Sequence, residues 1–351
     1  MKKEILIGLL FLSQTILAQI PISNTHNGMR SGDLLRKVEV GYVSAGSAGH
    51  NQVWSLGEIT SDSKEFLQGI LSGGDTVAVF EKGRILHYLT HGDTLYYKGY
   101  QQRNSYLLYG QERPFIRFPF AYGDSISGTY NGMGIDENVE LSVSGWGYTV
   151  ADGTGILTDG DNTIEQVTRI HAFDDYSENY GGQMVIQIRS DRYLWYCAGY
   201  RYPVIESIHR TIIEDGGAVT PLDSVTYLYL PVQQSDLNVD TPNASVLNQL
   251  YGIDAESHVP NGQTNGILSS VHASLSAGGN VLNVDYTLSA AGEIKIFAFD
   301  VMGNILGSSH HELKEAGECQ ESITLSRRPI ANVLMMRIQS NEETKSIKVN
   351  Y

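Results

Sequence analysis

The chain divides its apolar residues into short runs that are separated by turns rich in glycine and aspartate. Strand-like runs occupy 75–89, in two pieces around Lys82-Gly83, and then 95–100, 105–109, 140–144, 184–189, 193–197 and 225–232. Runs that recur about every 8–12 residues with turn residues between them are typical of sandwiches and barrels. The pattern therefore predicts an all-β protein, and we expect a β-sandwich or jelly-roll-like first domain over residues 25–235.

A three-residue turn motif recurs between the apolar runs. It is found as Gly74-Asp75-Thr76, Gly92-Asp93-Thr94, Gly123-Asp124-Ser125 and Gly160-Asp161-Asn162. Glycine adopts left-handed backbone angles at little cost, and an aspartate side chain bonds to its own backbone two residues on. We expect each copy to form a hairpin turn. Their irregular intervals argue against a solenoid or a propeller.

Polar residues dominate 236–266, and we expect a linker there that contains one helix over 243–252, capped by Asn243 and stopped by Gly252. A second short helix is expected over 62–69. The final 85 residues, 267–351, hold seven strand-like runs, which predict a small immunoglobulin-like β-sandwich. These runs are 270–277, 281–288, 293–300, 305–312, 318–325, 333–339 and 344–350.

The N-terminus has the layout of a secretory signal peptide over residues 1–19. Lys2 and Lys3 precede a mostly apolar stretch over 5–17, and Ala18 offers a small residue at a cleavage point. We therefore expect a secreted or cell-surface protein with no integral membrane segment after signal cleavage. The formal net charge of -15 argues against nucleic acid and anionic membranes as partners.

Metal sites and cofactors find little support in the sequence. The two cysteines, Cys197 and Cys319, lie far apart and outside any CxxC spacing, so a structural zinc site is not expected, and their pairing stays open. The acidic segment with Asp152, Asp159 and Asp161 could supply oxygen ligands to calcium, but two hairpin turns explain it equally well. We expect no cofactor and no metal, with calcium as the alternative.

No strong catalytic constellation is present. The block from Phe120 to Ser125 resembles the nucleophile block of GDSL esterases, but none of the ten histidines follows an aspartate at the spacing of that family. A turn explains the block better. Asp174, Asp175 and Glu178 could act as acid and base on a glycosidic bond, or form a solvated acidic loop. We predict no catalytic residues.

An aromatic run around Cys197 is the best candidate for ligand binding. Its residues are Tyr193, Trp195, Tyr200 and Tyr202. In a strand, Tyr193 and Trp195 share one face. An exposed aromatic ring offers an apolar platform for a sugar ring, whereas the alternative is packing in the core with cross-strand aromatic pairs.

The last domain resembles the C-terminal sorting domain that Bacteroidetes attach to proteins exported by type IX secretion. The resemblance rests on 281–288, on 292–303 with Asp300 and Gly303 as its turn, and on the closing strand 345–349 with Lys345 and Lys348. The segments 32–40, 49–56, 118–125 and 151–157 are similar to a group of uncharacterised exported Bacteroidetes proteins. The resemblance implies export and an interaction with the type IX secretion machinery.

These observations together predict a non-catalytic binding or adhesion protein outside the cell. A glycan or an extracellular protein is the expected partner. A secreted glycan- or ester-cleaving hydrolase and a structural subunit of the cell surface remain alternatives.

Overall fold

A computed structural model describes eleven stretches of the chain. They are 19–55, 63–159, 162–214, 217–234, 237, 240–251, 267–300, 305–309, 312–328, 333–340 and 344–350. The predicted signal peptide, apart from Gln19, lies outside these residues. Within them, no helix is long and apolar enough to cross a membrane.

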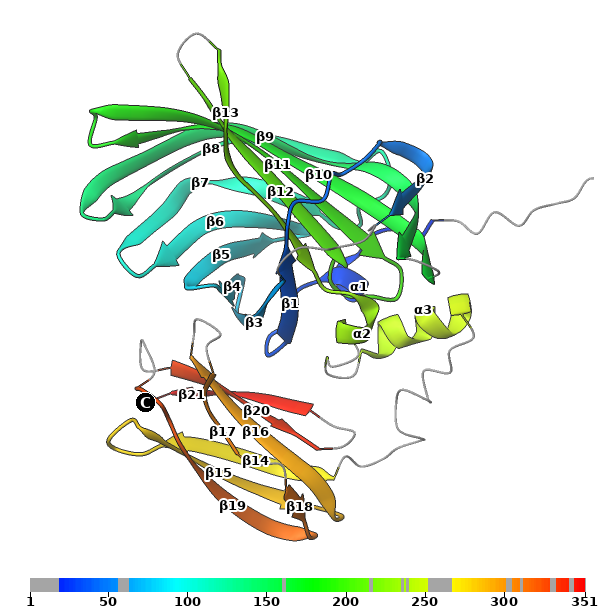
Figure 1. The fold of residues 1–351 in the computed structure, drawn as a ribbon, viewed down its shortest axis with the longest axis vertical. Helices are drawn as coiled ribbons and strands as arrows, with labels where there is room; N and C mark the ends of the chain where they lie inside the picture. The colour runs from blue at the N-terminus through cyan, green and yellow to red at the C-terminus, as the bar shows by residue number, and fades with distance from the viewer. Residues whose placement is uncertain are drawn as a thin grey trace, which may run out of the picture.

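Twelve antiparallel strands close into a barrel in the first part of the chain (Figure 1). They run around it in the order β10, β11, β12, β13, β1, β3, β4, β5, β6, β7, β8 and β9, and β9 pairs with β10 to close the ring. Their bounds are β1 Leu34–Val40, β3 Lys64–Gly73, β4 Thr76–Glu81, β5 Arg84–His91, β6 Thr94–Gln102, β7 Ser105–Arg117, β8 Ser125–Asp136, β9 Val139–Asp159, β10 Asn162–Tyr180, β11 Met184–Cys197, β12 Ile205–Ile213 and β13 Val219–Leu228. All-β structure is confirmed.

The closed barrel differs from the sandwich or jelly-roll-like arrangement that the sequence predicts. From β3 to β13 each strand pairs with the next one along the chain, as in an up-and-down barrel, and no crossover between two sheets occurs. Pairing of the first strand with the last is a long-range contact that run lengths do not encode. The predicted helix over 62–69 is also wrong, because Lys64–Gly73 forms β3 between β1 and β4.

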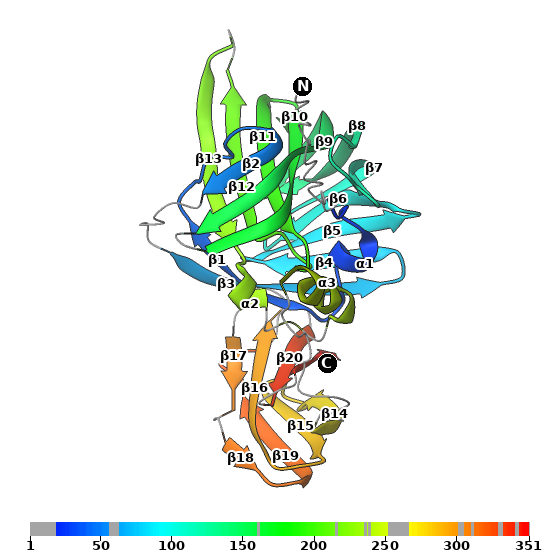
Figure 2. The ribbon, with the colours of Figure 1, turned by 90° about the vertical axis from the view of Figure 1, so that its right-hand side faces the viewer.

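The two ends of the barrel differ in their connections. Up-and-down topology places the turns at Gly74, Gly92 and Gly123 at one end, and all three glycines have positive φ. We call this end the closed end, because α1 Asn24–Asn27, α2 Pro231–Gln234 and α3 Thr241–Tyr251 gather there (Figure 2). We call the opposite end, with the β4–β5, β6–β7, β8–β9 and β10–β11 turns, the mouth.

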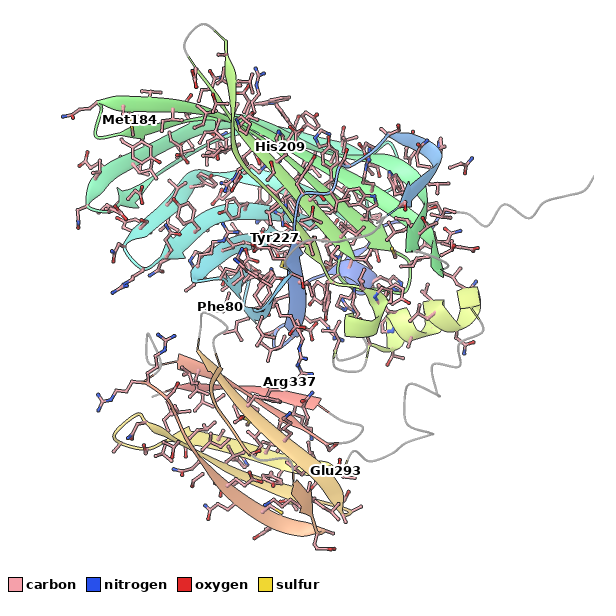
Figure 3. The ribbon with its side chains drawn as sticks, viewed as in Figure 1. Phe80, Met184, His209, Tyr227, Glu293 and Arg337 are labelled. Carbon is pink, nitrogen blue, oxygen red and sulfur yellow. The ribbon has the colours of Figure 1, made fainter. Side chains whose placement is uncertain are left out.

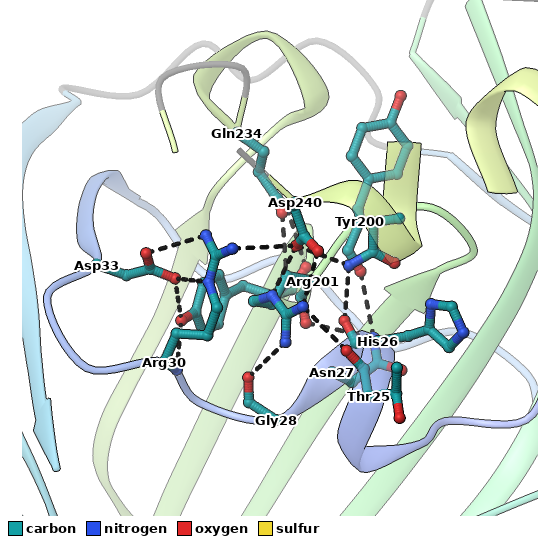
Figure 4. A network of polar contacts seen from close by, with 12 residues as sticks. Thr25, His26, Asn27, Gly28, Arg30, Asp33, Tyr200, Arg201, Gln234 and Asp240 are labelled. Atoms are coloured by element: carbon teal, nitrogen blue, oxygen red, sulfur yellow. Dashed lines mark hydrogen bonds and ion pairs between the residues drawn. The ribbon is translucent and has the colours of Figure 1, made fainter. Parts of the chain in front are cut away.

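A network of buried polar contacts fastens the helices to the closed end (Figure 4). Arg201 is its centre: its guanidinium donates to both carboxylate oxygens of Asp240 at 2.6 and 2.8 Å and to the carbonyls of Gly28 and Thr25 at 2.9 Å. Asn243 donates from its amide to the carbonyl of His26 at 2.8 Å. The helical part of the predicted linker therefore packs against the barrel.

Beside this network, Tyr202 and Arg30 both contact Asp33. The Tyr202 hydroxyl donates to Asp33 Oδ2 at 2.7 Å, and Arg30 donates to the same carboxylate at 3.0 Å. These contacts fix the chain before β1 against the β11–β12 connection. The closed end is thus built from three segments that are distant in sequence.

The strand β2 Gly49–Ser55 lies on the outside of the barrel, where it pairs in parallel with β9. Arg169, with only 1% of its side chain exposed, holds this segment. All three of its guanidinium nitrogens donate hydrogen bonds: Nε and Nη2 to Asp152 at 2.8 Å, and Nη1 to the carbonyls of Ala45 and Gly46. Its guanidinium carbon lies 5.4 Å from the Trp54 ring centroid and 5.8 Å from that of Trp195.

The second unit consists of two sheets around one apolar core (Figure 1). One sheet holds β14 Leu268–Leu275, β15 Val281–Leu288 and β19 Gly317–Thr324, and the other holds β16 Gly292–Asp300, β17 Ile305–Ser308, β18 Glu312–Lys314, β20 Val333–Gln339 and β21 Thr344–Asn350. Six of the seven predicted runs correspond to one strand each, and the run at 305–312 covers β17 and reaches β18. Leu282, Ile296 and Leu334 are fully buried in its core.

Candidate functional site

The barrel encloses a cavity of about 590 Å³. An eight-stranded barrel is just wide enough for its own side chains to fill, and the diameter grows with strand number, so twelve strands leave space at the centre. The lining reaches the mouth at Lys82 and Gln102, which border the β4–β5 and β6–β7 turns. A volume of this size lies within the range of roughly 300–1,000 Å³ that is usual for small-molecule sites.

Seven tyrosines line this lumen: Tyr88, Tyr97, Tyr100, Tyr109, Tyr130, Tyr176 and Tyr227. They come from six strands, because alternation along each strand sends every second side chain inward. Figure 3 shows side chains filling both faces of the wall, with Tyr227 of the lumen and Met184 at the tip of the β10–β11 hairpin labelled. The rings of Tyr97 and Tyr109 meet edge-on at 5.6 Å, and those of Tyr109 and Tyr130 are tilted at 5.2 Å.

Glycines on β8 and β9 make room for these rings. A Cβ added at Gly132 would lie 2.5 Å from a ring carbon of Tyr109, and one at Gly145 would lie 2.9 Å from the Tyr130 hydroxyl. These glycines have ordinary strand backbone, so they are present for space and not for turns. The tyrosine-rich lumen therefore depends on small residues in the facing strands.

The lumen tyrosines remain protonated at neutral pH and so act as hydrogen-bond donors. Burial raises the pKa of Tyr97, Tyr109 and Tyr130, and it raises the pKa of Tyr100 to about 12. Within the described part of the chain, the hydroxyls of Tyr97, Tyr100, Tyr109 and Tyr130 form no hydrogen bond. All four residues line the cavity, so a ligand there would lie next to them.

Charged side chains lie between the tyrosines, and most are paired. Arg84 donates to Glu81 at 2.8 Å, Arg113 to Asp174 at 2.7 Å, and Arg210 pairs with Asp223. Arg113 also donates to the Thr149 hydroxyl and to the carbonyls of Pro114, Tyr148 and Phe173, so it is fully engaged in holding the wall. Glu178 accepts a hydrogen bond from Tyr180 at 2.7 Å.

A layer of side chains closes the lumen toward the closed end, and we call it the floor. Tyr88, Phe115, Arg192 and Glu206 line both the large cavity and a second one of about 120 Å³ beneath it. Arg192 lies 2.7 Å from Glu206, and Lys37 donates to Glu206 at 3.4 Å. Burial opposes ionisation of Glu206, but these two cations hold its pKa below the usual range.

The four predicted aromatic ligands do not form one surface. Tyr193 and Trp195 share the outer face of β11, as the alternation predicts, but Trp195 is 2% exposed beneath Trp54. Tyr202 is 5% exposed in the closed end, and Tyr200 packs against the core under β2. Trp195 and Tyr202 are covered by other parts of the chain and Tyr200 is partly buried, so the four side chains do not meet on one exposed surface.

Tyr193 instead belongs to an outer aromatic strip, which we define as Trp146, Tyr148, Phe173, His171 and Tyr193. Tyr148 stacks on Phe173 at 5.3 Å, and His171 stacks on Tyr193 at 4.3 Å with 9° between the ring planes. Each stacked pair is also a register pair of neighbouring strands, so the rings cover one another's faces. Trp146 is the most exposed member, at 44%.

The predicted acidic cluster is split by strand alternation. Asp174 faces the lumen and is bound by Arg113, whereas Asp175 faces outward and accepts from Gln187 and Arg189. Ser125 begins β8 after a turn in which the Asp124 carboxylate accepts from the backbone of Ala121, as expected for a turn. The predicted acid-base set is therefore not assembled as a group.

The alternative calcium site and the sorting-like motif fall partly outside the described residues. Asp152 binds Arg169 through both oxygens, Asp159 ends β9, and Asp161 is not described. No cluster of three or more potential metal-ligating histidine, cysteine or acidic residues occurs within the described residues.

Three positions of the sorting-like motif lie within the described strands. Asp300 pairs with Leu334 and Lys348 with Met335, Lys345 donates to the carbonyl of Leu268, and Gly303 lies outside the described residues. Cys197 and Cys319 are both free thiols, the first buried on the outer wall.

Sequence reasoning missed the lumen, although one signal pointed to it. Gly132 and Gly134, and Gly145 and Gly147, recur at every second position within apolar or aromatic strands rather than at turns. Glycine within a strand often marks close approach of another group. Here that group is a lumen tyrosine at Gly132 and Gly145, the Arg113–Asp174 pair at Gly147, and the backbone of β7 at Gly134.

Comparison with known proteins adds no relative to this picture: no family model matches the chain, and no curated protein matches it.

Proposed function

We propose that the protein is an exported, non-catalytic binding protein that holds the end of a glycan in its barrel lumen. The cavity carries this proposal. Protein interiors leave few voids larger than a water molecule, so a volume of about 590 Å³ inside a closed wall is a site rather than a packing defect. Saccharides match its lining, because tyrosine faces accept the apolar side of a sugar ring and paired hydroxyl, guanidinium and carboxylate groups bond sugar hydroxyls.

The lumen supports this function better than the outer aromatic strip does. A sugar stacks on an open ring face, and the strip uses the faces of Tyr148, Phe173, His171 and Tyr193 for its own pairs. The lumen rings of Tyr97, Tyr109 and Tyr130 meet at edges and steep angles instead. The hydroxyls of these three tyrosines and of Tyr100 also form no hydrogen bond within the described part of the chain.

The charge pairing favours binding over hydrolysis. A glycosidase needs one carboxylic acid with a raised pKa as proton donor. In the lumen Glu81, Asp174, Glu206 and Asp223 each lie against a cation, and the two cations beside Glu206 lower its pKa. Glu178 lies about four residues along β10 from Asp174, roughly 13 Å, beyond the usual separation of a catalytic pair.

Filling the cavity tests the proposal. Ser190 lines the lumen on β11, and we expect Ser190→Trp to weaken binding by at least about 100-fold, since a bulky ring occupies the sugar position. A glycan array on the mature full chain identifies the ligand, and titration calorimetry then measures its affinity for each variant.

The matched control is Ser127→Trp, which adds the same ring on the exposed outer face of β8 and should leave the affinity unchanged. Equal affinity of the two variants would place the ligand outside the lumen. Release of reducing sugar from a bound glycan would show a hydrolase.

We further propose that the two-sheet second unit is an immunoglobulin-like tail that serves in type IX export and surface attachment. The resemblance of 281–288, 292–303 and 345–349 to that sorting domain supports this role. A chain truncated after Tyr251 keeps α3 and its contacts with the barrel. In a bacterium with type IX machinery, we expect this truncated chain to accumulate in the periplasm while the full chain reaches the surface. Surface proteolysis and immunoblotting measure where each chain is located. Arrival of the truncated chain at the surface would contradict the sorting role.

A further inference from the structure

The floor of the lumen carries more positive than negative charge. It contains two cations, Lys37 and Arg192, and one carboxylate, Glu206. Further charged pairs of the lumen, Arg84 with Glu81, Arg113 with Asp174 and Arg210 with Asp223, are each balanced. One positive charge is therefore left over deep inside the barrel.

The remaining lumen carboxylate does not neutralise this charge. Arg192 is opposite Ala172 in the register of β10 and β11, and Glu178 lies six residues farther along β10 toward the mouth. Six residues of strand span about 20 Å. Glu178 thus lies toward the mouth, and the excess positive charge of the floor is not neutralised by it.

The excess charge is presented to the cavity by Arg192. Its side chain is 28% exposed, whereas those of Glu206 and Lys37 are 8% and 6% exposed. Because the strands form a closed wall and Arg192 lines the cavity, its exposed surface faces the lumen. Glu206 is more deeply buried and fixes the position of Arg192.

Arg192 also has unused hydrogen-bonding capacity. Its Nη2 lies 2.7 Å from Glu206 and its guanidinium is 5.3 Å from the Phe115 ring centroid, but its Nε is buried without a partner among the described residues. A guanidinium suits a planar carboxylate, and part of the Arg192 side chain is exposed to the cavity. The floor therefore provides one excess positive charge for an anionic group.

We propose that the lumen selects a saccharide that carries a carboxylate, such as a uronic acid at the end of a glycan, and seats this group on Arg192. The inference rests on the proposed function, since it names the class of glycan that the same cavity takes. The tyrosines hold the sugar ring, and the carboxylate completes the charge balance of the floor.

Two matched sugars test this inference on the mature full chain. Methyl β-glucuronide and methyl β-glucoside differ only at the carboxylate, and ligand-observed NMR measures their affinities. We expect the glucuronide to bind about 10- to 100-fold more tightly, as is typical of hydrogen bonds to a charged group. Propionate, a carboxylate without a sugar ring, should bind far more weakly than the glucuronide.

Arg192→Met should reduce the ratio of the two affinities to about one. The variant keeps an apolar stem over Phe115 and leaves Glu206 with Lys37, so the floor becomes balanced and the barrel should still fold, which its melting temperature verifies. Arg192→Lys keeps the positive charge but lacks the planar, two-pronged guanidinium, so it should retain part of the preference for the glucuronide. Arg189→Met, on the outer face of the same strand, should leave the ratio unchanged.

The outcomes separate this inference from the proposed function. Equal affinity of the two sugars for the wild-type chain, or a preference that survives in Arg192→Met, would overturn the acidic ligand and leave a neutral glycan in the lumen. Propionate binding as tightly as the glucuronide would overturn the proposal that the ligand is a saccharide and would leave a site for carboxylates in general. Binding of neither sugar, together with a glycan array without hits, would overturn both proposals.

Discussion

Asp240→Asn is expected to lower the free energy of unfolding of the barrel by about 3–5 kcal/mol, the range found when one partner of a buried ion pair is removed. Arg201 is 5% exposed and its guanidinium holds Asp240 through two hydrogen bonds. The neutral amide leaves this cation buried without a counter-charge. Urea unfolding followed by tryptophan fluorescence measures the change.

The same pair makes the closed end sensitive to acid. Burial opposes ionisation of Asp240, but bonds from Arg201 and Asn243 outweigh it and lower its pKa below the ordinary value. The folded state therefore binds fewer protons than the unfolded state near the unfolded pKa of about 3.9. The stabilisation is complete above that pH and is lost as the pH falls through the lower folded value, so Asp240→Asn should flatten the acid limb of the stability profile.

The control for this prediction is Asp175→Asn, which breaks a partly exposed pair with Arg189 on the outer wall. We expect a change of at most about 1 kcal/mol there, as for surface ion pairs in general. A loss of similar size in both variants, or a loss below about 1 kcal/mol in Asp240→Asn, would show that the network of Figure 4 does not fasten the closed end.

Arg169→Met is expected to release the outer segment and to destabilise the barrel by about 3–5 kcal/mol. The substitution leaves Asp152 without its cation and the carbonyls of Ala45 and Gly46 without their donor. It also removes the guanidinium that lies over the rings of Trp54 and Trp195. The amide hydrogens of β2 should then exchange much faster in hydrogen–deuterium exchange.

Arg189→Met provides the comparison for Arg169→Met, since it removes an arginine from the same wall without touching β2. Unchanged protection of residues 49–55 in the Arg169 variant would mean that pairing with β9 alone holds the strand. Faster exchange in both variants would point to a general loosening of the wall rather than to a local fastening by Arg169.

Local patterns predicted the β structure well, and best in the second unit. Alternating runs such as 281–288 and 344–350 match β15 and β21 at both ends, because two-residue periodicity and turn residues act over short distances. The segment 62–69 was misassigned to a helix because its composition is ambiguous, and pairing with β1 and β4 decides its structure.

The barrel and its lumen depend on contacts that a single sequence does not display. Alternation shows that Asp174 and Asp175 lie on opposite faces, but it does not show which face turns inward. That choice follows from closure of the barrel between β13 and β1, which joins residues far apart in the chain. The spacing of Gly145 and Gly147 indicates that lumen side chains need the space beside these strands. Glycine is also the commonest turn residue, so a single sequence does not separate the two roles.

The most direct test of the central claim is ¹⁹F NMR of the chain without its predicted signal peptide, labelled with 3-fluorotyrosine and titrated with the glycan that the array selects. Single Tyr→Phe variants assign the signals of Tyr109, Tyr130 and Tyr176 in the lumen and of Tyr148 and Tyr193 on the outer strip. We predict that the three lumen signals shift with saturation while the two outer signals stay in place. Shifts confined to Tyr148 and Tyr193 would contradict a ligand site inside the barrel.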